Sequence, residues 1–202
     1  LDELRGQPHV VRYLKAFAAN PSPTAFMFSG GSGVGKSESG RLLALALGAD
    51  PTQDTLGGYH QIPAGQQTAD AVIEQFRSLA LRPMFSKTGW KVLVVDEADR
   101  MSPAAEMIWL GRLEQIPAKS VIVFTTNEHG KLPQRIVNRC TDIAFRDTIA
   151  ALAPALKTFA EDVWEGETGS RDCPIAEVAG LPQMGHCNPS FRLAIRQLDT
   201  AL

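Results

Sequence analysis

The chain has 202 residues, of which 44% are hydrophobic and 21% charged, so it can form one large domain or two small ones with a sizeable core. Its formal net charge of -2 provides no overall attraction to nucleic acid, and any DNA contact therefore requires a local basic patch. The sequence shows neither a signal peptide nor an apolar run long enough to cross a bilayer. We therefore expect a cytoplasmic protein with no membrane partner.

The chain has three cysteines, Cys140, Cys173 and Cys187, which lie far apart. An odd number at these spacings makes neither a disulfide framework nor a Cys-x-x-Cys zinc site. His186 beside Cys187 is a possible pair of metal ligands, but the sequence offers no clear third and fourth ligand. We expect reduced thiols and no zinc.

Two hydrophobic patterns alternate along the first three quarters of the chain. Short apolar runs that read as buried strands occur at residues 25–28, 59–62, 91–95, 120–125 and 143–145. Apolar residues at helical spacing occur at residues 10–17, 42–47, 67–81 and from Ser102 onward, where Ser102 acts as the cap and Pro103 occupies the first turn. Residues 49–58 are polar and read as a surface connection. Alternating strands and helices predict an α/β fold, a mainly parallel sheet with helices on both faces.

The β pattern stops near Asp147. Residues 149–164 and 190–202 read as helices that are separated by a loop rich in glycine and proline. We therefore predict two domains, a nucleotide-binding domain at residues 1–147 and a small all-helical lid at residues 148–202.

Residues 30–37 read Gly-Gly-Ser-Gly-Val-Gly-Lys-Ser and fit the phosphate-binding loop pattern G-x-x-x-x-G-K-[ST]. The glycines permit backbone angles and close approach that a side chain would block, and successive amides at a helix start bind polyphosphate. Lys36 can reach the β- and γ-phosphates, and Ser37 can place its hydroxyl on Mg²⁺. An accidental glycine-rich turn is the alternative, but an expected strand precedes the motif and an expected helix follows it. The motif therefore predicts a nucleoside triphosphate site.

Polar residues follow two of the expected strands, at the edge of the sheet where ligands bind in this class of fold. Asp96 is placed to hold Mg²⁺, and Glu97 to orient and polarise the water that attacks the γ-phosphate. Asn127 is placed to hydrogen-bond that water or the γ-phosphate. Taken alone, the acidic pair also suits a solvated turn, and Asn127 a turn asparagine.

Several motifs, taken in their order along the chain, resemble those of one protein family. These are the loop at residues 30–37, Val-Leu-Val-Val-Asp-Glu at residues 92–97, Thr-Thr-Asn at residues 125–127, Asn-Arg-Cys at residues 138–140 and Phe-Arg-Leu-Ala at residues 191–194. Together with the opening segment at residues 4–11 they resemble the AAA+ ATPases of sliding-clamp loaders, such as replication factor C small subunits and the bacterial polymerase III gamma and delta-prime subunits.

The resemblance implies a role for each matching residue. Arg139 becomes an arginine finger that completes the site of an adjacent subunit, although Asn138 stands where the family usually has serine. Arg192, on the sensor 2 helix, would contact the γ-phosphate of its own subunit, and Asn127 would be sensor 1. The nucleotide-binding set is then Val10, Val11, Gly31, Ser32, Gly33, Val34, Gly35, Lys36, Ser37, Glu38 and Arg192.

The resemblance also implies ATP and Mg²⁺ as cofactors, and as partners other AAA+ subunits, a sliding clamp and primer–template DNA. Glutamines stand at residues 66–67, where clamp loaders often place a basic residue near the DNA backbone. Arg100 and the helix start at Ser102 remain as phosphate contacts. The gamma-type zinc cysteines and the collar-forming helical domain of the family are absent from these 202 residues.

Three functions fit these features. The first is a clamp-loader ATPase, which opens a ring by binding ATP and releases it on DNA by hydrolysis. The second is another AAA+ machine, a helicase loader or a protein remodeller, but a threading ring should carry an aromatic pore loop and residues 62–68 have none. The third is a nucleotide-binding interaction subunit that does not hydrolyse, which the presence of Lys36, Asp96 and Glu97 argues against.

Overall fold

The computed structural model describes residues 1–181 and 188–201 of the chain. Its five strands form one sheet in the order β2-β3-β4-β1-β5, and every neighbouring pair is parallel. The strands are β1 Thr24–Ser29, β2 Tyr59–Ile62, β3 Lys91–Val95, β4 Ser120–Thr126 and β5 Thr141–Ala144. The predicted α/β fold with a parallel sheet is confirmed.

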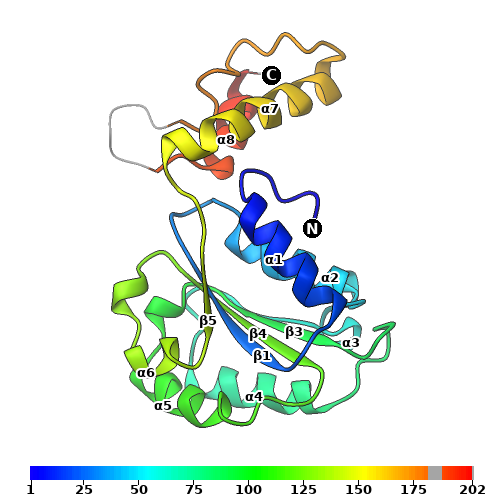
Figure 1. Ribbon diagram of the computed structural model, residues 1–202, viewed down its shortest axis with the longest axis vertical. Coiled ribbons are helices and arrows are strands. Elements are labelled where there is room, and N and C mark those ends of the chain that lie inside the picture. Colours follow the sequence, from blue (N-terminus) through cyan, green and yellow to red (C-terminus); the bar gives the residue numbers. More distant parts are fainter. Residues whose placement is uncertain (182–187, 202) are drawn as a thin grey trace.

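Helices cover both faces of the sheet (Figure 1), with α1 and α2 on one face and α4 and α5 on the other. The helices are α1 Pro8–Ala19, α2 Lys36–Ala46, α3 Asp54–Gly57, α4 Ala69–Ala80, α5 Pro103–Arg112, α6 Gln134–Val137, α7 Ile149–Thr168 and α8 Phe191–Ala201. Short 3₁₀ turns occur at η1 Pro51–Gln53, η2 Ala98–Arg100 and η3 His129–Lys131. Among the described residues, no helix is both long enough and apolar enough to span a bilayer.

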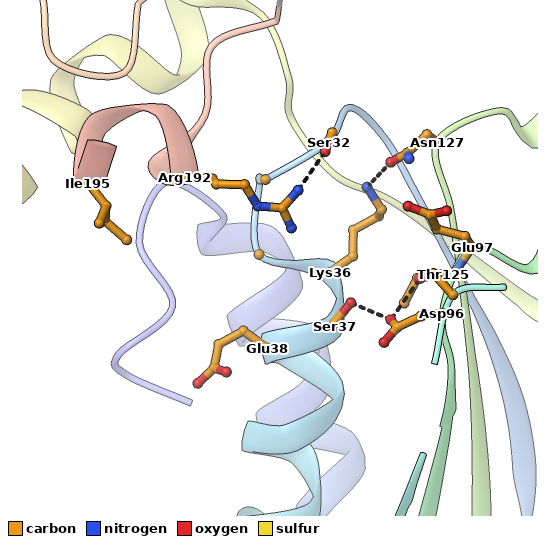
Figure 2. A pocket seen from close by; sticks show the side chains of 13 residues that line it. Ser32, Lys36, Ser37, Glu38, Asp96, Glu97, Thr125, Asn127, Arg192 and Ile195 are labelled. Carbon is orange, nitrogen blue, oxygen red and sulfur yellow. Dashed lines mark hydrogen bonds between the residues drawn. The ribbon is translucent and has the colours of Figure 1, made fainter. Parts of the chain in front are cut away.

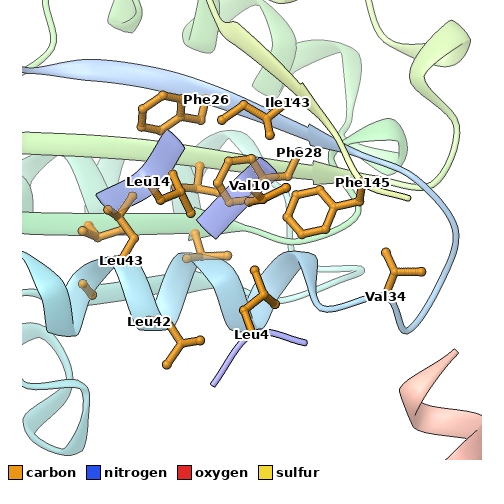
Figure 3. Close-up of a cluster of buried hydrophobic side chains, with 14 of the residues drawn as sticks. Leu4, Val10, Leu14, Phe26, Phe28, Val34, Leu42, Leu43, Ile143 and Phe145 are labelled. Atoms are coloured by element: carbon orange, nitrogen blue, oxygen red, sulfur yellow. The ribbon is translucent and has the colours of Figure 1, made fainter. Parts of the chain in front are cut away.

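The two faces of the sheet each bury a hydrophobic cluster. Under α1 and α2, Phe26 and Phe28 of the central strand β1 pack with Leu14 and Leu43 (Figure 3). On the other face Trp109 of α5 is fully buried, and its ring makes edge contacts with the ring of Phe124, at 4.7 Å between centroids. Because both faces are covered, β3 and β4 are buried along their whole length, as their continuous apolar runs predicted.

One expected boundary was wrong. The last strand was expected at residues 143–145 but spans Thr141–Ala144, because its pairing is set by the register with β1 rather than by apolar residues. The segment at residues 49–58 was expected to be a surface connection, and it is one that contains η1 and α3. A backbone hydrogen bond of 2.8 Å from Asp50 N to Gly57 O closes this segment, and Ala49 and Gly58 are buried.

The last two described helices, α7 and α8, pack against each other beyond the carboxyl ends of the strands (Figure 1). The rings of Phe159 and Phe191 meet edge to face at 5.4 Å. Helix α7 runs four residues past its expected end at residue 164 and stops at Gly169, whose φ of 74° is the left-handed conformation of a helix C-terminus. The division of the chain at residue 147 remains a prediction.

Candidate nucleotide-binding site

The phosphate-binding loop connects β1 to α2, as predicted, and two of its glycines are required by their surroundings. Gly33 has φ 77° and Gly35 has φ 100°, angles that L side chains rarely adopt. A Cβ on Gly33 would lie 2.9 Å from Ser190 Cβ at the start of α8, and one on Gly35 would lie 2.8 Å from Leu4. The loop is therefore enclosed by the start of α8 on one side and by the segment around Leu4 on the other.

A cavity of about 380 Å³ opens between this loop, the strand ends and α8 (Figure 2). It is lined by Ser32, Gly33, Gly35, Lys36, Ser37, Glu38, Ala64, Asp96, Glu97, Thr125, Asn127, Arg192 and Ile195. Most of the predicted catalytic, metal and nucleotide-binding residues are in this set, although they come from segments more than 150 residues apart. Sequence reasoning did not identify Ala64, Thr125 and Ile195 as site residues, because only the tertiary fold places them here.

The Lys36 ammonium lies at the centre of the cavity and donates hydrogen bonds to three oxygens. These are Gly30 O at 2.8 Å, Gly31 O at 2.6 Å and Asn127 Oδ1 at 2.8 Å. Burial, followed by repulsion from Arg192, lowers the pKa of Lys36 to about 8, although nearby carboxylates oppose this shift. Polyphosphate oxygens would replace neutral acceptors with charged ones, which would favour the protonated lysine.

Asp96, at the end of β3, gathers three donors around its carboxylate. Its Oδ1 accepts hydrogen bonds from Ser37 Oγ and from Thr125 Oγ1, the latter at 3.1 Å, and its Oδ2 accepts one from Gln61 Nε2 at 2.6 Å. A hydroxyl and a carboxylate oxygen in contact are the hard ligands that Mg²⁺ prefers. Ser37 and Asp96 therefore fit the predicted metal site, and Gln61 and Thr125 hold the carboxylate in place.

Glu97 follows with a left-handed backbone, φ 49° and ψ 52°, which turns its side chain into the cavity beside Asn127 (Figure 2). The backbone N–H of Glu97 donates to Thr125 Oγ1 at 3.2 Å, and Gln67 Nε2 donates to the carbonyl oxygens of Asp96 and Glu97. Its carboxylate Oε2 is buried and lies 3.1 Å from Arg100 Nη1, an ion pair by distance but without hydrogen-bond alignment. One oxygen of Glu97 is thus left without a directed donor.

Helix α8 and the linker between β5 and α7 both contact the phosphate-binding loop. Arg192 Nη1 donates to Ser32 Oγ at 3.2 Å, and the N–H of Phe191 donates to Gly33 O at 3.1 Å. Asp147, which lies between β5 and α7, accepts a hydrogen bond of 3.0 Å from the amide of Gly31. This contact of Asp147 carries no sequence signal, because it depends on how the linker returns to the loop.

Seven of the predicted residues do not line the cavity. One of them, Gly31, lies beside it, since its carbonyl oxygen accepts the Lys36 hydrogen bond. Val10 and Val34 are fully buried in the hydrophobic cluster under α1 and α2, and Val11 packs partly against it. Arg139 donates to Glu114 Oε1 and Arg135 O, each at 2.8 Å. Arg100 is exposed, and Ser102 Oγ accepts the N–H of Ala105 as the cap of α5. Their roles remain predictions, and His186 and Cys187 lie outside the described residues.

Comparison with known proteins finds similar sequences among DNA-replication subunits. A family model described as DNA polymerase III, delta subunit, matches residues 58–148. The replication factor C small subunit of Picrophilus torridus is 25% identical over 148 residues, which covers 72% of this chain and 45% of that protein. DNA polymerase III subunit tau of Bacillus subtilis is 23% identical over 161 residues, which covers 72% of this chain and 29% of that protein. The chain thus spans less than half the length of these relatives.

Two solved structures from Thermotoga maritima share the fold. A DNA polymerase III gamma subunit-related protein superposes with a TM-score of 0.65 and 17% identity, covering 94% of this chain and 57% of that chain. A RuvB variant superposes with a TM-score of 0.72 and 17% identity, covering 98% of this chain and 62% of that chain. The chain therefore has the fold of the AAA+ P-loop ATPases, and in sequence it resembles the clamp-loader subunits among them.

Proposed function

We propose that this chain is the ATP-binding and ATP-hydrolysing AAA+ subunit of a clamp-loader-like complex, which loads a sliding clamp on DNA during replication. The observation that carries the proposal is the convergence of Lys36, Asp96, Glu97 and Asn127 on one cavity at the phosphate-binding loop. These are the groups that bind a triphosphate, hold its metal and position the attacking water.

In this proposal the loop amides and Lys36 hold the β- and γ-phosphates. Ser37 and Asp96 would hold Mg²⁺, which when bound would neutralise phosphate charge. Arg192 would contact the γ-phosphate, and its hydrogen bond to Ser32 already brings it to the phosphate-binding loop. The resemblance adds Val10 and Val11 on the adenine side.

Glu97 orients the water that attacks the γ-phosphorus, while Asn127 holds the same water or a γ-oxygen. The new P–O bond forms as the bond to the β–γ bridging oxygen breaks, giving ADP and inorganic phosphate, and Glu97 accepts the proton of the water. The Glu97 oxygen that faces Arg100 has no aligned hydrogen-bond donor, so the ion pair is the interaction that would have to weaken before this oxygen takes the proton. Arg139, which is on the surface and away from its own cavity, would stabilise the transition-state charge in a neighbouring subunit.

The DNA contact proposed for Arg100 has a consequence for Glu97. The side chain of Arg100 is 68% exposed, and its guanidinium lies 3.1 Å from the Glu97 carboxylate. A DNA phosphate that attracted Arg100 would weaken this pair and leave Glu97 free to hold water. The helix start at Ser102 would add a second phosphate contact. We therefore expect DNA to stimulate hydrolysis.

One observation favours a second candidate, another AAA+ machine. The superposition on RuvB has the higher TM-score, 0.72 against 0.65. Both structures are only 17% identical in sequence to this chain, so they are evidence for the fold alone. The relatives found by sequence are replication proteins. The first candidate is therefore preferred over a helicase loader, a protein remodeller or a subunit that only binds nucleotide.

The test is the ATPase rate, measured with and without primed DNA and a candidate clamp. Stimulation by both supports the clamp-loader proposal. An ATPase rate that does not change when the clamp is added would point to another AAA+ machine. Binding of Mg-ATP without turnover, even with neighbouring subunits present, would point to a subunit that only binds nucleotide. Lys36→Met is the control, because it removes the ammonium that holds the phosphates and should abolish the stimulated rate.

A further inference from the structure

A second cavity, of about 420 Å³, lies at the edge of the sheet opposite the nucleotide site. Lys91 is the first residue of β3, and Lys119 directly precedes β4, so this cavity is at the amino ends of strands whose carboxyl ends carry Asp96 and Asn127. Its lining residues are Ala80, Arg82, Thr88, Gly89, Lys91, Pro117, Ala118 and Lys119. Three of them are cations, and no acidic residue is among the lining set.

Lys91 is the most unusual of the three. It is only 6% exposed, and its ammonium donates to Leu79 O at 2.5 Å. A buried ammonium is costly unless a counter-charge lies nearby. Burial lowers the pKa of Lys91, and within the described part of the chain no carboxylate opposes this shift. Lys91 thus lines the cavity with a neutral carbonyl oxygen, and no carboxylate, as its partner.

Lys119 is held over the same cavity by a strained backbone. Its φ of 53° is left-handed, which costs a lysine about 1 kcal/mol. The side chain crosses Gly89, where an added Cβ would lie 3.9 Å from the ammonium, and its Nζ donates to Thr88 O at 2.9 Å. Both ammonium groups, each with three donors, have donors left over for a ligand.

We propose that this cavity binds a phosphate-type oxyanion between Arg82, Lys91 and Lys119. A phosphomonoester or pyrophosphate group carries close to two negative charges and several acceptor oxygens, so it can accept from all three cations at once. A backbone phosphodiester carries one negative charge per phosphate, but successive phosphates along a strand can share the three cations. The phosphate comes either from a small molecule or from a nucleic-acid backbone. The proposal does not depend on nucleotide hydrolysis at the other edge of the sheet.

The test uses pyrophosphate as the probe and isothermal titration calorimetry as the measurement, in a Lys36→Met background that removes the competing phosphate-binding lysine. The test variant adds Arg82→Gln and Lys119→Gln, which remove two charges at exposed positions. The matched control adds Arg12→Gln and Arg135→Gln, which remove two exposed charges elsewhere. Anisotropy of a labelled oligothymidine measures the nucleic-acid source in parallel.

We expect the parent and the control to bind one of the two probes with affinities within about twofold of each other, because distant exposed charges are screened. The test variant should bind it at least about tenfold more weakly, because two charge-assisted hydrogen bonds are lost. Loss for pyrophosphate alone identifies a small-molecule phosphate, and loss for the oligonucleotide identifies a backbone phosphate. Equal binding by test and control variants, or no binding of either probe to the parent, overturns the proposal. Recovery on Lys119→Arg excludes a folding defect.

Discussion

Lys36 carries a cost in stability that should be measurable through its pH dependence. Folding lowers the pKa of Lys36 from its ordinary value of 10.5 to about 8, mainly through burial. The folded state therefore binds this proton less tightly than the unfolded chain does. The resulting destabilisation is fully present below pH 8 and fades as the pH rises towards 10.5.

The magnitude follows from the size of the shift, since one pKa unit corresponds to about 1.4 kcal/mol. At pH 7 the cost is about 3 kcal/mol, and at pH 10, where part of the unfolded population is also neutral, it falls to about 1 kcal/mol. The side chain is only 7% exposed, so solvent screening does not remove the effect. Lys36→Met abolishes the titration and leaves every other group in place.

The assay is urea unfolding of the chain and of Lys36→Met at pH 7 and pH 10. The free energy of unfolding of the unsubstituted chain, relative to the variant, should rise by about 2 kcal/mol between the two pH values. Other titrating groups cancel in this difference. A difference that does not change with pH would show that the buried ammonium is fully compensated by Gly30, Gly31 and Asn127 and would refute the reasoning.

The remaining predictions concern catalysis and the core. Glu97→Gln should keep Mg-ATP binding and lower turnover by about 10²-fold or more, since the amide cannot accept a proton; unchanged turnover would remove Glu97 from its proposed role. Arg139→Ala should leave ATP binding by the isolated chain intact and lower the rate of the assembly by about 10³-fold, whereas weaker binding by the isolated chain would contradict a role in trans. Trp109→Ala should lower the free energy of unfolding by about 3–5 kcal/mol, as measured by urea titration, and a loss below about 1 kcal/mol would mean that the core collapses around the gap.

The sheet was predictable where both faces of a strand are buried. The sequences of strands β3 and β4 are mainly continuous apolar runs, which are typical of parallel strands covered on both faces. Strand β5 begins with Thr141 and Asp142, which are exposed at the edge, so hydrophobicity alone placed it too late in the chain. The first and last residues of an edge strand are set by its pairing with the neighbouring strand, and this pairing cannot be read from the sequence of the edge strand alone.

The candidate site likewise contains residues that a local motif marks and residues that only the tertiary fold brings together. Lys36, Ser37 and Asp96 were identified because the motif fixes both residue type and spacing, and the structure brings them together. Gln61, Asp147 and Ile195 reach the site through tertiary contacts, and no local pattern marks them. Glutamines at residues 66–67 were noted only as replacements for a basic residue, but Gln67 is 3% exposed and holds the backbone of the acidic pair.

Backbone strain is a feature that sequence patterns miss entirely, and here it occurs after the carboxyl end of β3 and before the amino end of β4. Among the described residues, the non-glycine residues with positive φ are Glu97 and Lys119. Lys119→Gly should therefore raise the free energy of unfolding by about 1 kcal/mol relative to Lys119→Ala, because glycine adopts this conformation without cost. Both variants should weaken binding of whichever probe the parent binds, pyrophosphate or the oligonucleotide, by the same factor, since both lack the ammonium. If the alanine variant is as stable as the glycine variant in urea unfolding, the backbone at Lys119 stores no strain, and the side chain is simply placed by the turn before β4.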